Sequence, residues 1–296
     1  MTPLGQWRKD GKFFEANGYK LAFWTTAEPD DAKPWLLLIH GFPTSSWDWS
    51  PIWKALEEKF NLAAMDMLGF GLSDKPANIR YSIMHQADFY EALLERLGVS
   101  EAHIFAHDYG DTVAQELLAR HNEKSLSFSI KSVCFLNGGL FPEQHRPRPV
   151  QKLALTPFGP IIGMMLTRDK LRKNFDDIFG ANTKASDTEI DGHWALFEEN
   201  GGGKIFHKLM QYIPQRKANR SRWVGALMEA HIPLRLIDGG VDPVSGKHLY
   251  EYYLDMVPNA DAVLLEDIGH YPHTEAPERV LAAFFGFHQK FGAPVT

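Results

Sequence analysis

Short apolar runs alternate along this chain with longer stretches in which apolar residues recur at helical spacing. The runs are continuous, and glycine, proline or charged residues end them, which is typical of strands buried on both faces of a sheet. Strands are expected at 35–39, 62–65, 102–106, 130–136, 233–237 and 262–265, and helices at 82–97, 110–120 and 277–291. Because strands and helices alternate, we predict an α/β fold with a mostly parallel central sheet flanked by helices.

The pattern changes between Gly139 and Trp223, where strand patterns are absent and helical, aromatic and basic segments follow one another. We interpret this stretch as a helical cap inserted into the sheet domain. The core would then comprise 1–140 and 223–296, and the cap 141–222. A length of 296 residues suits one large α/β domain with such an insertion.

Composition and charge exclude several classes of protein. Hydrophobic residues make up 44% of the chain, and the net charge of −6 comes without a long like-charge run, so nucleic acid is not an expected partner. Cys134 is the only cysteine, so no intrachain disulfide can form. No run approaches the ~18 apolar residues of a membrane span. The polar segment 1–10 lacks the apolar core of a signal peptide, so we expect a cytoplasmic protein, monomeric or oligomeric.

Asp108 stands at the tip of a predicted strand–turn–helix motif. The turn is Ala106-His107-Asp108-Tyr109-Gly110, with a small residue two positions to either side of Asp108. This is the form of a nucleophile elbow, which usually presents a serine. A carboxylate at that place is suited to displacing a leaving group from saturated carbon and forming an alkyl ester. The motif therefore favours epoxides or alkyl halides over carboxylic esters as substrates.

Two further residues complete the order nucleophile, acid, histidine that such hydrolases show along the chain. Asp242 and His270 each follow an expected strand, which would bring both loops to the sheet edge that carries the elbow. Asp238 and His273 are the alternatives. A glycine pair just before Asp242, and Gly269 before His270, suit tight loops that present a side chain, so we favour Asp242 and His270.

Each of these residues has a chemical task. Asp108 must be ionised, which the N-terminus of the following helix favours. His270 would take a proton from water, and Asp242 would hold its tautomer and stabilise the imidazolium. The backbone N–H groups of Phe42 and Tyr109 would form an oxyanion hole. This chemistry needs no metal and no cofactor.

These motifs resemble the α/β-hydrolase superfamily, and within it the branch of epoxide hydrolases and haloalkane dehalogenases, which use an aspartate nucleophile. The resemblance is closest to the mesoderm-specific transcript protein family, whose members are epoxide-hydrolase-like. It covers residues 35 to 272 and rests on His40-Gly41-Phe42-Pro43-Thr44-Ser45-Ser46, His107-Asp108-Tyr109-Gly110-Asp111, Asn137-Gly138-Gly139, Gln211-Tyr212-Ile213, Gln215-Arg216-Lys217 and Arg222-Trp223-Val224-Gly225-Ala226-Leu227.

The resemblance implies an epoxide substrate. Haloalkane dehalogenases hold the departing halide with a tryptophan and an asparagine where this chain has Tyr109 and Phe42. Fluoroacetate dehalogenases share the cap pair His193-Trp194, but they carry arginines just after the nucleophile, which this chain lacks. Epoxide hydrolases use cap tyrosines that donate hydrogen bonds to the epoxide oxygen. Tyr212 is the only tyrosine of the predicted cap, and it is the candidate donor, with a packed cap aromatic as the alternative.

We therefore expect hydrolysis of a small apolar epoxide to a diol through an ester on Asp108. Removal of halide from a haloalkane or haloacid by the same nucleophile is the alternative reaction. A hydrolase-fold protein that only binds a ligand is the non-enzymatic alternative. His40, His193 and Trp194 are candidate substrate contacts, for which structural roles in a loop or on a half-buried helix face are the alternatives.

One apolar segment of the cap, residues 158–166, has no assigned role in this chemistry. It is short and contains two glycines and a proline, so we expect it to form a wall of the substrate cavity or the core of the cap, with a membrane-touching patch as the alternative. Lys217, Arg220 and Arg222 form a basic cluster near the end of the cap, expected to be a solvated face that pairs with acidic residues.

Overall fold

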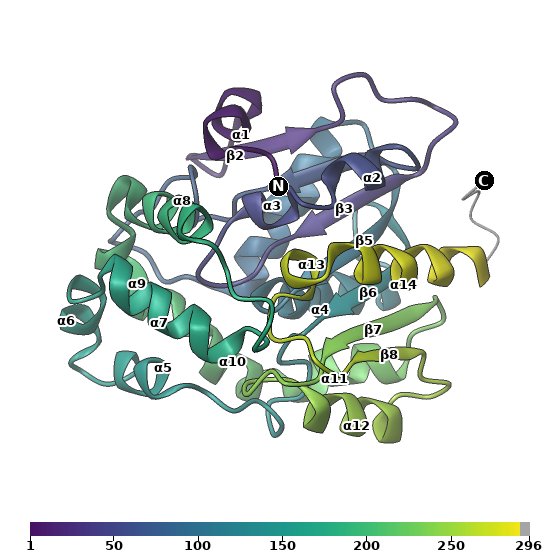
Figure 1. Ribbon diagram of the computed structural model, residues 1–296. Helices are drawn as coiled ribbons and strands as arrows, with labels where there is room; N and C mark the ends of the chain where they lie inside the picture. Colours follow the sequence, from purple (N-terminus) through teal and green to yellow (C-terminus); the bar gives the residue numbers. More distant parts are fainter. Residues whose placement is uncertain (291–296) are drawn as a thin grey trace.

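Eight strands form a sheet in the order β1-β2-β4-β3-β5-β6-β7-β8 in the computed structural model, which describes residues 1–290 (Figure 1). β1, β2 and β4 pair antiparallel at one edge, and all other neighbouring strands pair in parallel. The strands are β1 (Lys12–Ala16), β2 (Tyr19–Thr25), β3 (Trp35–Ile39), β4 (Asn61–Met65), β5 (Glu101–His107), β6 (Ser129–Leu136), β7 (Leu234–Gly239) and β8 (Ala262–Leu265). The predicted α/β fold with a mostly parallel central sheet is confirmed.

The helices fall into two groups by their place in the chain. The first group lies outside the connection between β6 and β7 and comprises α1 (Leu4–Asp10), η1 (Ser46–Trp49), α2 (Trp53–Glu57), α3 (Ile83–Arg96), α4 (Tyr109–Asn122), α12 (Lys247–Met256), α13 (Pro272–Glu275) and α14 (Pro277–Lys290). We add to it the last helix of that connection, α11 (Arg220–Met228). The rest of that connection forms α5 (Pro149–Ala154), α6 (Gly159–Met164), α7 (Arg168–Ile178), α8 (Asp187–Glu198), η2 (Glu199–Gly201), α9 (Gly202–Leu209) and α10 (Tyr212–Ala218), here called the inserted helices.

Both faces of the sheet are buried, which explains why its strands are continuous apolar runs. In β3, Leu37 and Ile39 point to the face covered by α3, α4, α11 and α12. Leu36 and Leu38 point to the opposite face, which α2 and α14 cover. Alternation of side chains between two buried faces therefore leaves no polar position in the middle of this strand.

The sequence analysis missed the N-terminal hairpin of β1 and β2. Its turn is Asn17-Gly18, and both residues have positive φ values, of 51° and 80°. A two-residue Asn-Gly turn is a strong hairpin signal, because only such residues readily adopt positive φ. The signal was present in the sequence, but the strands around it are short, and Phe13 faces solvent.

The inserted helices lie together beside the sheet (Figure 1). The last helix of this connection, α11, packs instead against α4, where the indole N–H of Trp223 donates to Glu116 over 2.8 Å. The boundary predicted between residues 222 and 223 therefore falls inside a helix that packs on the sheet domain. The predicted end of the last helix, Phe291, lies outside the described residues. Among residues 1–290, no helix has both the length and the apolar character needed to cross a membrane.

Candidate active site

Asp108 occupies a sharp turn between the end of β5 and the start of α4. Its backbone has φ 49° and ψ −105°, a conformation that side-chain-bearing residues rarely adopt and that costs about 1–3 kcal/mol. Gly110 permits this turn, because a Cβ atom there would overlap the carbonyl oxygen of Ile39 on the neighbouring strand. The elbow thus holds the Asp108 side chain at the carboxyl edge of the parallel strands.

The Asp108 carboxylate lies among hydrogen-bond donors and positive charge. Oδ2 accepts a hydrogen bond of 3.0 Å from the backbone N–H of Phe42. Oδ1 lies 4.0 Å from Nε2 of His270 and 4.0 Å from a guanidinium nitrogen of Arg216. Burial would raise the pKa of Asp108, but His270 and Arg216 outweigh it and lower that pKa below its ordinary value. The carboxylate is therefore ionised and available as a nucleophile at neutral pH.

His270 is joined to Asp242 by a hydrogen bond of 2.7 Å between Nδ1 and Oδ2. Burial would lower the pKa of His270, but the carboxylates of Asp242 and Asp108 raise it to about 9. Burial likewise opposes ionisation of Asp242, yet His270 and nearby donors lower the pKa of Asp242 to about 2. The resting site therefore holds a protonated imidazole between two carboxylates.

Two donors that hold Asp242 were not foreseen from the sequence. The amide of Asn137, just after β6, donates to Asp242 Oδ2 over 3.1 Å, and the hydroxyl of Ser245 donates to the same oxygen over 2.9 Å. Asp238, the alternative acid, is buried, and its carboxylate oxygens have no hydrogen-bond partner within residues 1–290. Burial raises the pKa of Asp238 well above its ordinary value, so this side chain is neutral. The structure thus places Asp242, and not Asp238, against His270.

The two expected oxyanion-hole amides are arranged differently. The Phe42 N–H already points at Asp108 Oδ2. The Tyr109 N–H belongs to the residue that begins α4, directly after Asp108 in the chain. An oxyanion on the Asp108 carboxyl would therefore have one donor already in place, the Phe42 amide.

A cavity of about 390 Å³ opens above Asp108 and His270. Its floor also includes Phe42, and the inserted helices supply most of its walls. Trp194 lines this cavity, whereas its neighbour His193 does not and is buried against Trp47. Aromatic and aliphatic side chains dominate the lining, so the cavity suits a small apolar molecule.

His40, expected as a substrate contact, does not line the cavity. Its ring is fully buried, with Nδ1 2.8 Å from the carbonyl oxygen of Gly41, and Nε2 accepts the N–H of Met67 over 3.0 Å. Both nitrogens are thereby satisfied by backbone in a single neutral tautomer. The structural alternative given for His40 agrees with this placement.

Tyr212 packs over the elbow, but it is buried and is not among the residues that line the cavity. Its ring centroid lies 5.1 Å from that of Tyr109, and its hydroxyl accepts a hydrogen bond of 3.2 Å from the amide of Gln151, which lines the cavity. Burial and the nearby Asp108 carboxylate raise the pKa of Tyr212, so the phenol stays protonated. Because Gln151 donates, the phenolic proton remains free to be given to another acceptor.

Arg216 is the main residue of the site that the sequence analysis did not single out. This arginine of α10 is buried, and its guanidinium donates to the carbonyl oxygen of Asp108 over 3.0 Å and to Thr112 Oγ1 over 2.6 Å. It also lies 4.5 Å from the centre of the Tyr212 ring. Its neighbours Arg220 and Arg222 pair with acidic side chains as expected, and nothing in the basic run marks Arg216 as the buried member.

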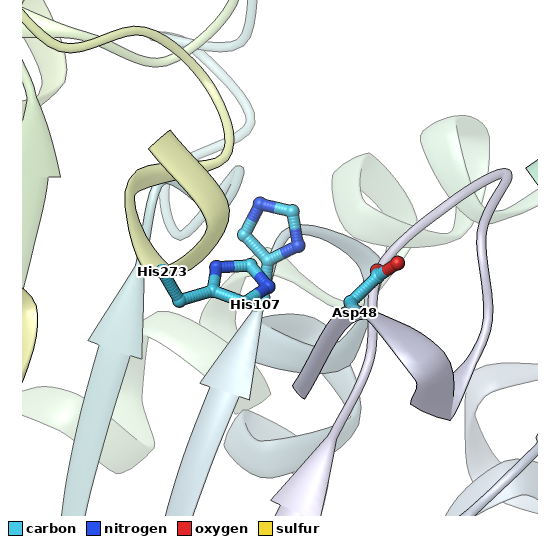
Figure 2. Close-up of side chains that lie close together, drawn as sticks. All are labelled: Asp48, His107 and His273. Carbon is cyan, nitrogen blue, oxygen red and sulfur yellow. The ribbon is translucent and has the colours of Figure 1, made fainter. Parts of the chain in front are cut away.

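Three buried side chains, Asp48, His107 and His273, lie together behind the elbow (Figure 2). Their ligand atoms are all within 4.8 Å of one another, and Nδ1 of His193 lies 3.7 Å from Asp48 Oδ1. Burial lowers the pKa of these histidines and raises that of Asp48, so the group is neutral. Imidazole nitrogen and carboxylate oxygen are also metal ligands, so these side chains could hold a divalent ion. They lie apart from the cavity, and His107 donates from Nε2 to the carbonyl oxygen of His270.

Comparison with known proteins finds relatives with the same fold. The model of the alpha/beta hydrolase fold family matches residues 34–277. The mesoderm-specific transcript homolog protein of Bos taurus is 41% identical over 296 residues, covering 97% of this chain and 88% of that protein. The putative hydrolase LipZ of Mycobacterium tuberculosis is 33% identical over 273 residues, covering 92% and 93%. A haloalkane dehalogenase, the DbeA-M1 loop variant from Bradyrhizobium elkanii, superposes with a TM-score of 0.77 at 20% identity over 95% and 98% of the chains, which shows the shared fold.

Proposed function

This chain belongs to the alpha/beta hydrolase fold family and, within it, groups with the mesoderm-specific transcript proteins, and we propose that it opens an epoxide to a diol through an ester on Asp108. One observation carries the proposal: the elbow presents an ionised carboxylate, not a hydroxyl, beneath an apolar cavity. A carboxylate attacks the saturated carbon of a strained ring and gives a stable alkyl ester, whereas its attack on a carboxylic ester would give a reactive anhydride.

The first step uses the oxygen of Asp108 that is free. Because Oδ2 accepts the Phe42 N–H, Oδ1 attacks an epoxide carbon. The new C–O bond forms as the ring C–O bond breaks, and the electron pair of that bond stays on the ring oxygen. Tyr212, whose hydroxyl is bonded to the cavity-lining Gln151, donates the proton that this alkoxide needs, and the indole N–H of Trp194 in the cavity wall is the alternative donor. Such general acid help contributes about 10²–10⁴-fold to the rate.

The second step uses His270 as a base. When Asp108 becomes a neutral ester, one of the carboxylates that raise the pKa of His270 disappears, so His270 loses its proton, and a proton returns to the Tyr212 phenolate left by the first step. Neutral His270 then removes a proton from water, which attacks the ester carbonyl carbon. Negative charge develops on Oδ2, where the amides of Phe42 and Tyr109 stabilise it. Collapse breaks the bond from carbonyl carbon to Oδ1, and the departing alkoxide takes the second proton of the attacking water. The diol thus leaves with Oδ1, and Asp108 is again a carboxylate beside a protonated His270.

Trapping the ester tests this scheme. His270→Gln should allow attack but block hydrolysis, so intact mass should rise by one whole epoxide when the variant is mixed with a panel of terminal epoxides. His270→Gln combined with Asp108→Ala is the matched control and should gain nothing. A single turnover of the unmodified enzyme in ¹⁸O-water should give unlabelled diol and place the label in Asp108.

The same experiment separates the alternatives. A mass gain equal to an alkyl group without its halogen, from haloalkanes or haloacids, would assign the protein to dehalogenation. Labelled diol in the first turnover would mean direct attack by water and would overturn the ester mechanism. Thermal stabilisation by epoxides or halides that are never converted would support a protein that only binds its ligand.

A further inference from the structure

Exposed apolar side chains gather on α5 and α6. Among residues 1–290, ten large hydrophobic side chains are exposed, and five of them lie within residues 153–165. They are 45–65% exposed and form what we call the apolar face: Leu153, Phe158, Ile161, Met164 and Met165. The expectation of a cavity wall or cap core, made for residues 158–166, is therefore wrong for Phe158, Ile161, Met164 and Met165. Leu166 is the residue of the segment 158–166 that lines the cavity.

Two glycines explain why the large side chains point outward. Gly159 and Gly163 are buried on the opposite side of α6, and a Cβ atom on Gly163 would overlap the carbonyl oxygen of Gly203 in α9. The inward side of α6 is thus too close to α9 for any side chain. The fold directs Phe158, Met164 and their neighbours to solvent, although burial of such side chains stabilises a protein by about 1.5–3 kcal/mol each.

The surroundings of the apolar face are strongly basic. The segment from Arg148 to Lys173 contains six basic residues and one acidic residue, in a chain whose net charge is −6. Arg148, Arg168 and Arg172 are paired with carboxylates. Within residues 1–290, the ammonium groups of Lys152, Lys170 and Lys173 have no carboxylate partner, and that of Lys170 donates to the carbonyl oxygen of Met165.

The apolar face is continuous with the cavity above Asp108. Val150 of α5 and Leu166, just after α6, line that cavity, and so do Lys170 and Lys173. A partner held on this face would therefore lie beside the substrate cavity.

We propose that the apolar face docks on an anionic lipid surface. Phe158, Met164 and Met165 enter the headgroup region, and Lys152 and Lys173 contact lipid phosphates. An interfacial helix combines apolar burial with electrostatic attraction in this way. A second copy of the chain fits less well, because a two-fold contact through this face would oppose the unpaired lysines of the two copies. Binding of this face to lipid does not depend on the reaction at Asp108.

Vesicle flotation tests the docking. The unmodified protein should float with phosphatidylcholine vesicles that contain phosphatidylglycerol, and salt should weaken its binding. The variant Phe158→Ser/Met164→Ser/Met165→Ser should bind at least about tenfold more weakly. The control Phe13→Ser/Met228→Ser/Leu254→Ser removes three exposed apolar side chains from other surfaces and should bind like the unmodified protein. The variant Lys152→Glu/Lys173→Glu should bind weakly. Its control, Lys9→Glu/Lys54→Glu, should bind like the unmodified protein.

Several outcomes would overturn the docking. These are equal binding by the two serine variants, equal binding to vesicles with and without phosphatidylglycerol, or no flotation of the unmodified protein. The face would instead be assigned to a second copy of the chain by two results together. The unmodified protein would dimerise with rising concentration but not bind vesicles, and Phe158→Ser/Met164→Ser/Met165→Ser would abolish the dimer. Thermal unfolding of every variant shows that a loss of binding is not a loss of fold.

Discussion

The guanidinium of Arg216 donates a hydrogen bond of 3.0 Å to the backbone carbonyl oxygen of Asp108, and the same nitrogen lies 4.0 Å from the carboxylate of that residue. One side chain of the inserted helices therefore supports both the strained backbone of the elbow and the charge of the Asp108 carboxylate. The contact is buried, so water screens it little. It links the helices that form the cavity to the residue expected to react.

Replacing Arg216 should slow formation of the ester more than its hydrolysis. In Arg216→Gln the pKa of Asp108 rises and the elbow carbonyl loses a charged donor, a loss of about 1.5–3 kcal/mol, or about 10–150-fold in the rate of ester formation. Stopped-flow measurement of both steps checks this. Lys217→Gln, an exposed change at the next position, should leave both rates unchanged. Equal slowing of the two steps would point to general disruption of the site.

Asp242→Asn should slow hydrolysis of the ester by about 10²–10⁴-fold, because His270 loses the group that fixes its tautomer and stabilises its cation. The matched control is Asp238→Asn, at the end of the same strand. Since burial keeps the Asp238 carboxyl neutral, its amide replacement should be tolerated. Quantifying the ester by mass spectrometry in each variant distinguishes the two residues, and loss of hydrolysis in Asp238→Asn instead would contradict the assignment.

The pH dependence should separate the two chemical steps. Asp242 and Asp108 outweigh burial and raise the pKa of His270 to about 9, so the resting imidazole is charged at neutral pH. The ester lacks the Asp108 charge, so hydrolysis should rise with pH to a plateau whose midpoint lies below that resting value. Ring-proton NMR should also find a lower pKa for His270 in Asp108→Asn. An unchanged pKa would mean that the two side chains are not coupled.

Tyr212→Phe should slow ester formation by about 10²-fold or more, because the alkoxide loses a proton donor, while hydrolysis of the ester stays unchanged. Tyr252→Phe removes a hydroxyl that contacts Glu143 outside the site and serves as the control. If Trp194→Phe slows the reaction and Tyr212→Phe does not, the indole is the donor. Pre-steady-state rates with a chromogenic epoxide would provide the comparison.

A pair of glycine variants tests the packing that turns α6 outward. Gly163→Ala should lower the free energy of unfolding by about 1–3 kcal/mol, since the new methyl group overlaps backbone of α9. Gly225→Ala, on α11, has no atom within 4 Å of the new methyl group and should raise the free energy of unfolding by about 0.4–1 kcal/mol. Denaturant titration measures both. Similar values for the two variants would contradict the close contact of α6 with α9.

The sequence by itself determined the six parallel strands of the sheet and the chain order of the candidate residues Asp108, Asp242 and His270. Apolar runs such as 35–39 favour strands buried on both faces, because they are too short for a typical helix and glycine or proline flanks them. A sharp turn leaves room only for small residues two positions to either side of Asp108. This pattern of small residues identifies the elbow in the sequence. Asp242 and His270 follow strands whose carboxyl ends meet at one edge, so sheet topology alone brings them near Asp108.

Only the tertiary structure decided which faces of the inserted helices meet the site. Adjacent residues on a helix point about 100° apart, so His193 and Trp194 cannot both face the cavity, and helical spacing does not say which one does. The same holds for Arg216, buried in a basic run, and for the apolar residues of α6, which face solvent because Gly163 meets α9. Periodicity fixes which residues share a face, whereas the packing partner, distant in the chain, fixes where that face points.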